Sequence, residues 1–174
     1  MIVYTGTNID YATNDPLGIS GAIVKKMMEP YMDKGHILYT DNWYSSPSLC
    51  KYLLTKQTGA AGTVKANRKF YPRFPDTERG SVIRKQSDCG KILSLNWQDK
   101  KPVKMITTVN CGEMLDSGKV NFSTQEKIMK PDVVLDYNQN MRLVDKCDCQ
   151  LSGVECIRKC SKWYHKFFLP HIGC

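Results

Sequence analysis

The stretch "HILYTDNWYSS", residues 36–46, decides how the rest of the chain is interpreted. Its first five residues are mostly apolar or β-prone and predict a strand that is buried on both faces. Asp41 follows this strand directly. An acid in a loop is most often a solvated turn residue, whereas an acid fixed at the end of a buried strand is well placed to bind a ligand. The stretch by itself leaves both interpretations open.

Two helices and two further strands are predicted around this stretch. Residues 15–35, "DPLGISGAIVKKMMEPYMDKG", predict a helix because apolar residues recur at helical spacing and a glycine follows the end. Ser46 and Pro47 predict the start of a second helix, with a capping hydroxyl and a proline in the first turn. Short strands are predicted in residues 1–6 and in the glycine-flanked "TGAAGTV". This alternation predicts an α/β unit.

The middle of the chain has a different pattern. Turn residues separate the runs "SVIRK", "KILSLNW" and "VKMITTV", which predicts antiparallel β-hairpins. Trp97 alternates with apolar neighbours and is predicted to lie in the core. Residues 112–130 are polar and are predicted to form a loop. Residues 132–153 are predicted to begin as a short strand and to continue as a helix.

Composition restricts the class of protein. Apolar residues make up 41% and charged residues 24% of the 174 residues, which is typical of a globular domain. The net charge of +8 favours an anionic partner, with nucleic acid as the first candidate. No apolar run is long enough to cross a membrane, and the N-terminal residues lack the pattern of a signal peptide. We therefore expect an intracellular chain with reduced cysteines.

Three acids form a candidate metal site. A nuclease-type centre needs carboxylates from distant parts of the chain that converge on divalent cations. Asp41 is predicted at the end of a strand, and Asp145 and Asp148 share a face if their segment is helical. Both signals are weak alone, since a solvated turn acid and a solvated helix face explain them as well.

The chain resembles the piggyBac family of cut-and-paste transposases in several successive blocks, namely "YTG", "LYTDNWYSSPSLCKYLL", "GAAGTVKANRK", "NWQDKKPVKMITT" and "DYNQNMRLVDKCD". These blocks cover nearly the whole chain. The resemblance implies an α/β fold with an RNase H-like mixed sheet, flanking helices and a β-rich insertion. It assigns residues 1–69 to the N-terminal part of the core without its first strand, residues 70–130 to the insertion, and residues 131–174 to a truncated C-terminal segment that carries acids.

The resemblance also implies roles for individual residues. Asp41 matches the second catalytic acid of the family and Asp145 the third, with Asp148 as the next acid of that block. These residues would hold Mg²⁺ or Mn²⁺. The basic residues after the third predicted strand, Lys65, Arg68 and Lys69, would contact DNA phosphates, although a solvated basic loop is the alternative. A nuclear location and a homodimer are further implications.

Departures from the family pattern bear on activity. The family's first acid lies before "YTG", where this chain begins, and Arg142 and Leu143 replace two glycines before the third acid. We therefore expect a catalytically incomplete, transposase-derived fragment with residual nonspecific DNA binding. Two alternatives remain: an active metal-dependent transposase or nuclease whose gene model is truncated, and a domesticated DNA-binding or interaction module.

Two further groups of residues have competing interpretations. Trp43 and Tyr44, beside Asp41, could pack in the core or stack on bases. Four cysteines near the C-terminus follow the spacing C-x-C-x6-C-x3-C, which lacks the paired CxxC motifs of structural zinc sites. We therefore do not expect zinc. The cysteines concerned are Cys147, Cys149, Cys156 and Cys160.

Overall fold

The computed structural model describes residues 15–122 and 124–152. The chain divides into two units, residues 1–137 and residues 138–174, and the first of them contains both sheets. The described elements, in chain order, are α1 (Gly18–Met28), the 3-10 helix η1 (Glu29–Tyr31), β1 (Ile37–Thr40), α2 (Pro47–Thr55), β2 (Gly59–Thr63), β3 (Val82–Gln86), β4 (Leu93–Gln98), β5 (Pro102–Thr107), β6 (Met114–Val120), β7 (Lys127–Pro131) and α3 (Asp132–Ser152).

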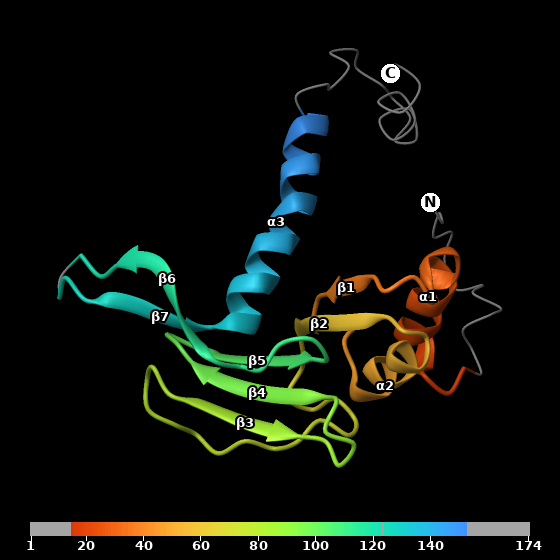
Figure 1. The fold of residues 1–174 in the computed structure, drawn as a ribbon, viewed down its shortest axis with the longest axis horizontal. Coiled ribbons are helices and arrows are strands. Elements are labelled where there is room, and N and C mark those ends of the chain that lie inside the picture. Colours follow the sequence, from red (N-terminus) through yellow and green to blue (C-terminus); the bar gives the residue numbers. More distant parts are fainter. Residues whose placement is uncertain (1–14, 123, 153–174) are drawn as a thin grey trace, which may run out of the picture. The chain divides into compact units, whose positions relative to one another are not determined.

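Five strands form one mixed sheet in the order β1-β2-β5-β4-β3 (Figure 1). The β1–β2 pair is parallel, with Ile37 opposite Gly59 and Thr40 opposite Gly62. The remaining pairs of this sheet are antiparallel. The predicted hairpins of the middle region are confirmed, and their strands belong to the same sheet as β1 and β2. The domain boundaries after residues 69 and 130 stay predictions.

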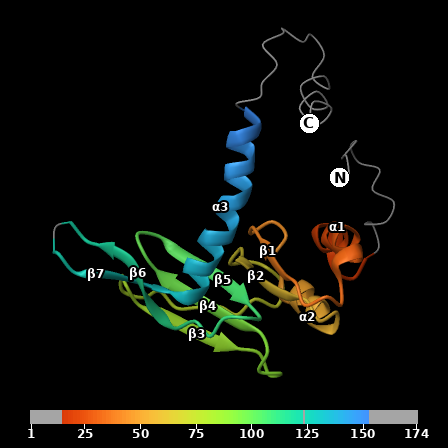
Figure 2. The same cartoon turned by 45° about the horizontal axis from the view of Figure 1, so that its top comes forward.

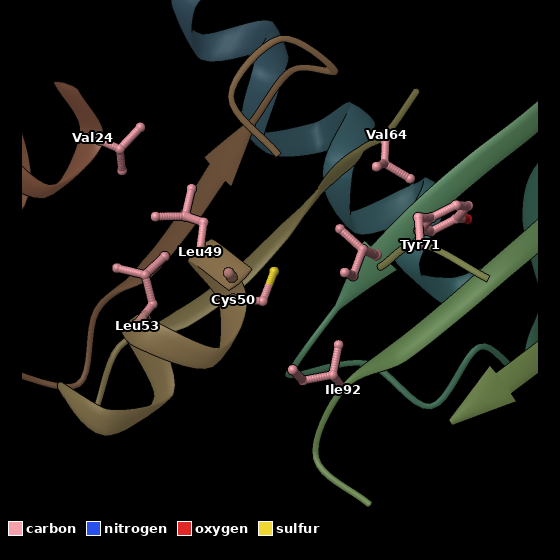
Figure 3. Packing of buried hydrophobic residues seen from close by; sticks show 9 residues of the cluster. Val24, Leu49, Cys50, Leu53, Val64, Tyr71 and Ile92 are labelled. Carbon is pink, nitrogen blue, oxygen red and sulfur yellow. The ribbon is translucent and has the colours of Figure 1, made fainter. Parts of the chain in front are cut away.

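Alternate residues of the sheet face two different apolar clusters, as the two-residue period of a strand requires. On one face, Ala60 of β2 and Ile106 of β5 pack with residues of α1 and α2. Figure 3 shows Val24 of α1 beside the α2 side chains Leu49 and Leu53. On the other face, another set of strand residues packs against the first turns of α3, namely Tyr39, Ala61, Leu95, Trp97 and Met105.

Local sequence signals explain where the helix after β1 begins. The Ser46 hydroxyl accepts a hydrogen bond from the Leu49 N–H at 3.1 Å, and Pro47 occupies the first helical position. This arrangement satisfies one free N–H of the first turn and uses the backbone angle that proline already has. The prediction of this helix start is therefore confirmed, as is the prediction of a helix within residues 15–35, where α1 is found.

Three predictions about secondary structure and burial were wrong. Residues 112–130 form most of a two-stranded antiparallel ribbon, β6 and β7, and not a loop. In Figures 1 and 2 this ribbon extends beyond the end of the five-stranded sheet. The segment after it is helical from Asp132 onward, with no initial strand. Finally, β1 is an edge strand of the described sheet, so Ile37 is 47% exposed and the strand is not buried on both faces.

No helix in the described part of the chain is both long enough and apolar enough to cross a membrane. The strand predicted in residues 1–6 lies outside the described residues.

Candidate functional site

The parallel pairing of β1 and β2 places two sequence-predicted groups at the same edge of the sheet. Both strands end at this edge, because Thr40 lies opposite Gly62 in the parallel register. Asp41 follows the last residue of β1, and the basic segment 65–69 follows β2 after Val64. Loops at the carboxyl ends of parallel strands commonly form ligand sites in open α/β sheets. The acid and the basic residues therefore belong to one candidate site.

Asp41 organises the turn that joins β1 to α2. Its carboxylate oxygen Oδ1 accepts hydrogen bonds from the backbone N–H groups of Trp43 at 3.1 Å and Tyr44 at 3.4 Å. The Asp41 carbonyl accepts from the Ser45 N–H at 3.0 Å and from the Ser45 hydroxyl at 2.8 Å. Among the described residues, none donates a hydrogen bond to the second carboxylate oxygen, Oδ2, and the residue is exposed. The turn thus fixes one oxygen of Asp41 and leaves the other accessible to solvent.

Close packing between the turn and β2 depends on a glycine. A Cβ atom at Gly62 would collide with the Ser45 hydroxyl and the Thr40 carbonyl. The Ser45 and Thr40 hydroxyl oxygens are 2.8 Å apart, and the Ser45 residue is buried. The absence of a side chain at Gly62 therefore lets the end of β2 lie directly against the base of the Asp41 turn.

The three predicted DNA-binding residues differ in their surroundings. Lys65 and Lys69 are exposed, and the Lys69 ammonium lies 5.0 Å from the centre of the Phe70 ring. Arg68 is half-buried, and its Nη2 atom donates to the carbonyls of Asn42 at 2.8 Å and Trp43 at 2.6 Å. The two lysines are thus available to solvent anions, while Arg68 also holds the Asp41 turn. No local sequence signal indicates this second role of Arg68, because its two partners lie 25 and 26 positions away.

An acid that the sequence reasoning did not select, Asp136, lies in a polar cluster between α3 and the sheet. The Tyr39 hydroxyl lies 3.0 Å and 2.9 Å from its two carboxylate oxygens, and the Asn110 side-chain amide donates to Oδ2 at 3.2 Å. Burial, reinforced by the hydrogen bond to Asp136, raises the pKa of Tyr39 to about 12, so the hydroxyl keeps its proton at neutral pH. Asp136 therefore connects the start of α3 to β1 and to the segment that follows β5.

The remaining predicted acids, Asp145 and Asp148, lie on α3, so the predicted helix is confirmed. Their side chains are outside what the structure describes, and they belong to the second unit of the chain. Within the described residues, no group of three or more His, Cys, Asp or Glu side chains could hold a metal ion. The convergence of Asp41 with Asp145 therefore stays a prediction. Cys156 and Cys160 lie outside the described residues, so the expectation about zinc is untested.

Comparison with known proteins identifies the family. The family model described as "Transposase IS4" matches residues 1–172, nearly the whole chain. The chain therefore belongs to this transposase family.

One similar solved structure is a piggyBac transposase in a synaptic complex with hairpin DNA. The two chains share 26% sequence identity, with a TM-score of 0.72. The match covers 96% of this chain and 34% of the piggyBac chain, so this chain spans about a third of that protein. The predicted resemblance to piggyBac transposases and the predicted RNase H-like α/β fold are both confirmed.

Proposed function

We propose that this chain is a transposase-derived domain that binds the DNA backbone without sequence preference and that does not cut DNA by itself. The observation that carries the proposal is the arrangement at one edge of the sheet. There, Asp41 and the exposed residues Lys65 and Lys69 lie on loops that Arg68 joins through two hydrogen bonds. The solved piggyBac structure, which contains hairpin DNA, supports DNA as the anionic partner.

The chemistry of the basic segment fits phosphate recognition. Lysine ammonium groups act as point charges toward phosphate oxygens and need no fixed geometry. Contacts of this kind displace counterions from DNA, so the affinity falls steeply as the salt concentration rises. The net charge of +8 adds a long-range attraction to the same partner. These contacts position a protein on a duplex and carry no sequence information.

The exposed carboxylate of Asp41 offers one oxygen ligand of the kind that divalent cations prefer. Mg²⁺ and Mn²⁺ prefer oxygen ligands, and Oδ2 of Asp41 is engaged by no donor of the described residues. The family resemblance adds Asp145 and Asp148 to the ligand set. When bound, such ions would activate the attacking oxygen and stabilise the leaving oxygen during strand cleavage. The residues of this chain would hold the ions and orient the DNA backbone beside them.

Two matched acids are too few for the proposed family site. The resemblance assigns the second and third acids to Asp41 and Asp145, and no residue of this chain matches the first. A site with only two of the three carboxylates holds the metal ions more weakly and stabilises less of the developing charge. The 174 residues are therefore expected to bind DNA and to leave it uncut. Nuclear location and self-association are part of the same proposal.

Fluorescence anisotropy with a labelled random duplex tests the DNA-binding part. We expect the logarithm of the affinity to fall linearly with the logarithm of the salt concentration. The double variant Lys65→Gln/Lys69→Gln is expected to reduce this slope by about two, roughly one for each lost phosphate contact. The matched control is Lys100→Gln/Lys101→Gln, which removes two exposed lysines between β4 and β5. Equal effects of the two double variants would contradict a DNA site at the Asp41 edge.

A plasmid-nicking assay with Mg²⁺ and with Mn²⁺ tests the absence of cleavage. We expect no nicking above background by the 174-residue chain. Metal-dependent nicking that Asp41→Asn abolishes would replace this proposal with an active nuclease. Binding to one duplex sequence in strong preference to random DNA would instead favour a sequence-specific, domesticated module.

A further inference from the structure

We infer that Arg68 is a positioning residue, which orients the Asp41 carboxylate through two peptide groups of the intervening turn. This inference concerns the orientation of Asp41, and only its consequence for metal binding rests on the function proposed above. The two side chains do not need to touch, because the same two peptide groups receive a hydrogen bond from Arg68 and give one to Asp41.

The contacts define this connection atom by atom. The peptide group between Asn42 and Trp43 accepts a hydrogen bond from Arg68 Nη2 at its carbonyl and donates its N–H to Asp41 Oδ1. The next peptide group, between Trp43 and Tyr44, does the same, with its carbonyl 2.6 Å from Arg68 Nη2 and its N–H 3.4 Å from Asp41 Oδ1. Both peptide dipoles therefore point from the guanidinium toward the carboxylate.

This alignment of the two peptide groups strengthens the hydrogen bonds that link Arg68 to Asp41. A cation at the carbonyl end of a peptide group polarises its N–H, and an anion at the N–H end polarises its carbonyl. The two polarised N–H groups hold Oδ1 of Asp41 in the turn. They thereby set the direction of Oδ2, the oxygen available to a cation. The carbonyl oxygens of Asn42 and Trp43 lie beside the positive charge of Arg68, which further stabilises this conformation of the turn.

The surroundings of Arg68 show that its protein contacts are built into the fold. The guanidinium Nε is buried without a hydrogen-bond partner among the described residues, and the side chain is half-buried. The hydrogen bonds described for this group are the two that Nη2 donates to the carbonyls of Asn42 and Trp43. A lysine at this position would keep the charge, but its ammonium nitrogen ends one bond short of the Nη2 position that reaches both carbonyls. Charge and positioning can thus be separated by one substitution.

The proposed consequence is that one residue links the DNA-binding segment to the metal-binding acid. Lys65 and Lys69 serve the phosphate backbone, whereas Arg68 sets the geometry of Asp41. Groups that orient a metal ligand typically change metal affinity by about ten- to a hundredfold when they are removed. Arg68→Lys is therefore expected to lower the Mn²⁺ affinity of the chain about tenfold while leaving the salt dependence of DNA binding unchanged.

The test compares Arg68→Lys with Lys69→Gln in the full 174-residue chain. Mn²⁺ binding is followed by electron paramagnetic resonance, amide exchange of Trp43 and Tyr44 by NMR, and DNA binding by anisotropy. We expect Arg68→Lys to weaken Mn²⁺ binding and to accelerate amide exchange at Trp43 and Tyr44. The salt dependence of DNA affinity should stay the same. Lys69→Gln is expected to reduce the salt dependence of DNA affinity. It should leave the Mn²⁺ affinity and the exchange rates of both amides unchanged. Unchanged metal affinity and amide exchange in Arg68→Lys would overturn the inference.

Two further measurements keep the outcomes distinct. Asp41→Asn is expected to remove most of the Mn²⁺ binding; if it does not, the proposed metal site fails and the amide exchange alone decides the role of Arg68. If Arg68→Lys does not fold, as judged by circular dichroism, the guanidinium resonances of the unaltered chain provide the test. Slow rotation of the Arg68 guanidinium group would support the inference, and free rotation would overturn it.

Discussion

Tyr39 on β1 and Asp136 on α3 are 97 positions apart in the chain, and the tyrosine hydroxyl lies within 3.0 Å of both carboxylate oxygens. The Asn110 side chain, beyond the end of β5, donates to the same carboxylate at 3.2 Å. The cluster joins the edge strand of the sheet to the first turns of α3. A hydrogen bond to a charged group contributes about 1.5–3 kcal/mol to stability.

Removal of the Tyr39 hydroxyl is therefore expected to destabilise the chain. Tyr39→Phe should lower the free energy of unfolding by about 2 kcal/mol, because Asp136 loses its tyrosine donor while the aromatic packing is kept. Urea unfolding followed by circular dichroism measures this difference. Asp136→Asn is the matched comparison and should cost less, since an amide oxygen can still accept the tyrosine proton. A larger cost for Asp136→Asn than for Tyr39→Phe would contradict this assignment of the hydrogen bond.

Gly62 is expected to be more sensitive to substitution than another glycine of the same strand. In Gly62→Ala the new methyl group meets the Thr40 carbonyl and the Ser45 hydroxyl, which is held in the turn by the Asp41 carbonyl. The backbone at Thr40 or Gly62 has to move, so the free energy of unfolding is expected to fall by about 1–3 kcal/mol. Thermal unfolding measures the loss.

The control is Gly59→Ala at the other end of β2. There the new atom would lie 2.6 Å from Val109 Cγ1 and 3.2 Å from Ile37 Cγ1, both of which belong to exposed side chains. These side chains can rotate away, so a smaller cost is expected than at Gly62. Equal melting temperatures for the two variants would show that the turn adapts to the added methyl group.

Tyr71 should contribute to stability in a pH-dependent way. Its hydroxyl is buried between the carbonyls of Leu95 and Met105, at 3.0 Å and 3.1 Å, and burial raises the pKa of Tyr71 well above its usual range. The folded chain therefore keeps this proton at a pH where the unfolded chain loses it. The resulting stability is fully present below pH of about 10 and is lost as the pH rises above that value.

The variant Tyr71→Phe tests whether the stability contributed by Tyr71 falls with rising pH. At pH 7 it should be less stable than the unaltered chain by about 1 kcal/mol, the usual net contribution of a buried hydrogen bond. The difference should shrink as the pH increases beyond about 10, because only the unaltered chain has a tyrosine proton to lose at this position. Urea unfolding at several pH values measures it. A difference that stays constant through this range would contradict the raised pKa.

Local patterns predicted the elements whose causes are local. Ser46 and Pro47 mark the start of α2 because the capping bond spans three residues. The β6–β7 ribbon was missed because its residues are mostly exposed and its strands lack a clean alternation of apolar and polar side chains. Its pairing, with Met114 opposite Pro131, comes from contacts across the ribbon and not from the local pattern.

The same reasoning separates the parts of the site that could be predicted from those that could not. Asp41 stood out because it directly follows an apolar strand, and the parallel register then placed it beside the basic segment. The second role of Arg68 and the role of Asp136 depend on partners that lie far along the chain. No local spacing rule identifies such partners, so these residues became visible only in three dimensions.

Trp43 offers a last contrast, because it lies two residues after Asp41 and is 43% exposed, whereas Trp97 is 5% exposed. The Trp43 and Tyr44 rings meet edge to face, with their centres 4.8 Å apart. Trp97→Ala should destabilise the chain by about 3–5 kcal/mol. Trp43→Ala should leave the unfolding transition almost unchanged.

The effect of Trp43→Ala should appear instead in the binding of single-stranded DNA, where stacking on an aromatic ring contributes about 1–3 kcal/mol per base. Anisotropy with a labelled oligonucleotide at fixed salt measures the loss of affinity, and Trp43→Phe should restore most of it because a phenyl ring still stacks. If Trp43→Ala binds the oligonucleotide as tightly as the unaltered chain, the indole does not stack on bases, and its role is limited to shaping the turn that carries Asp41.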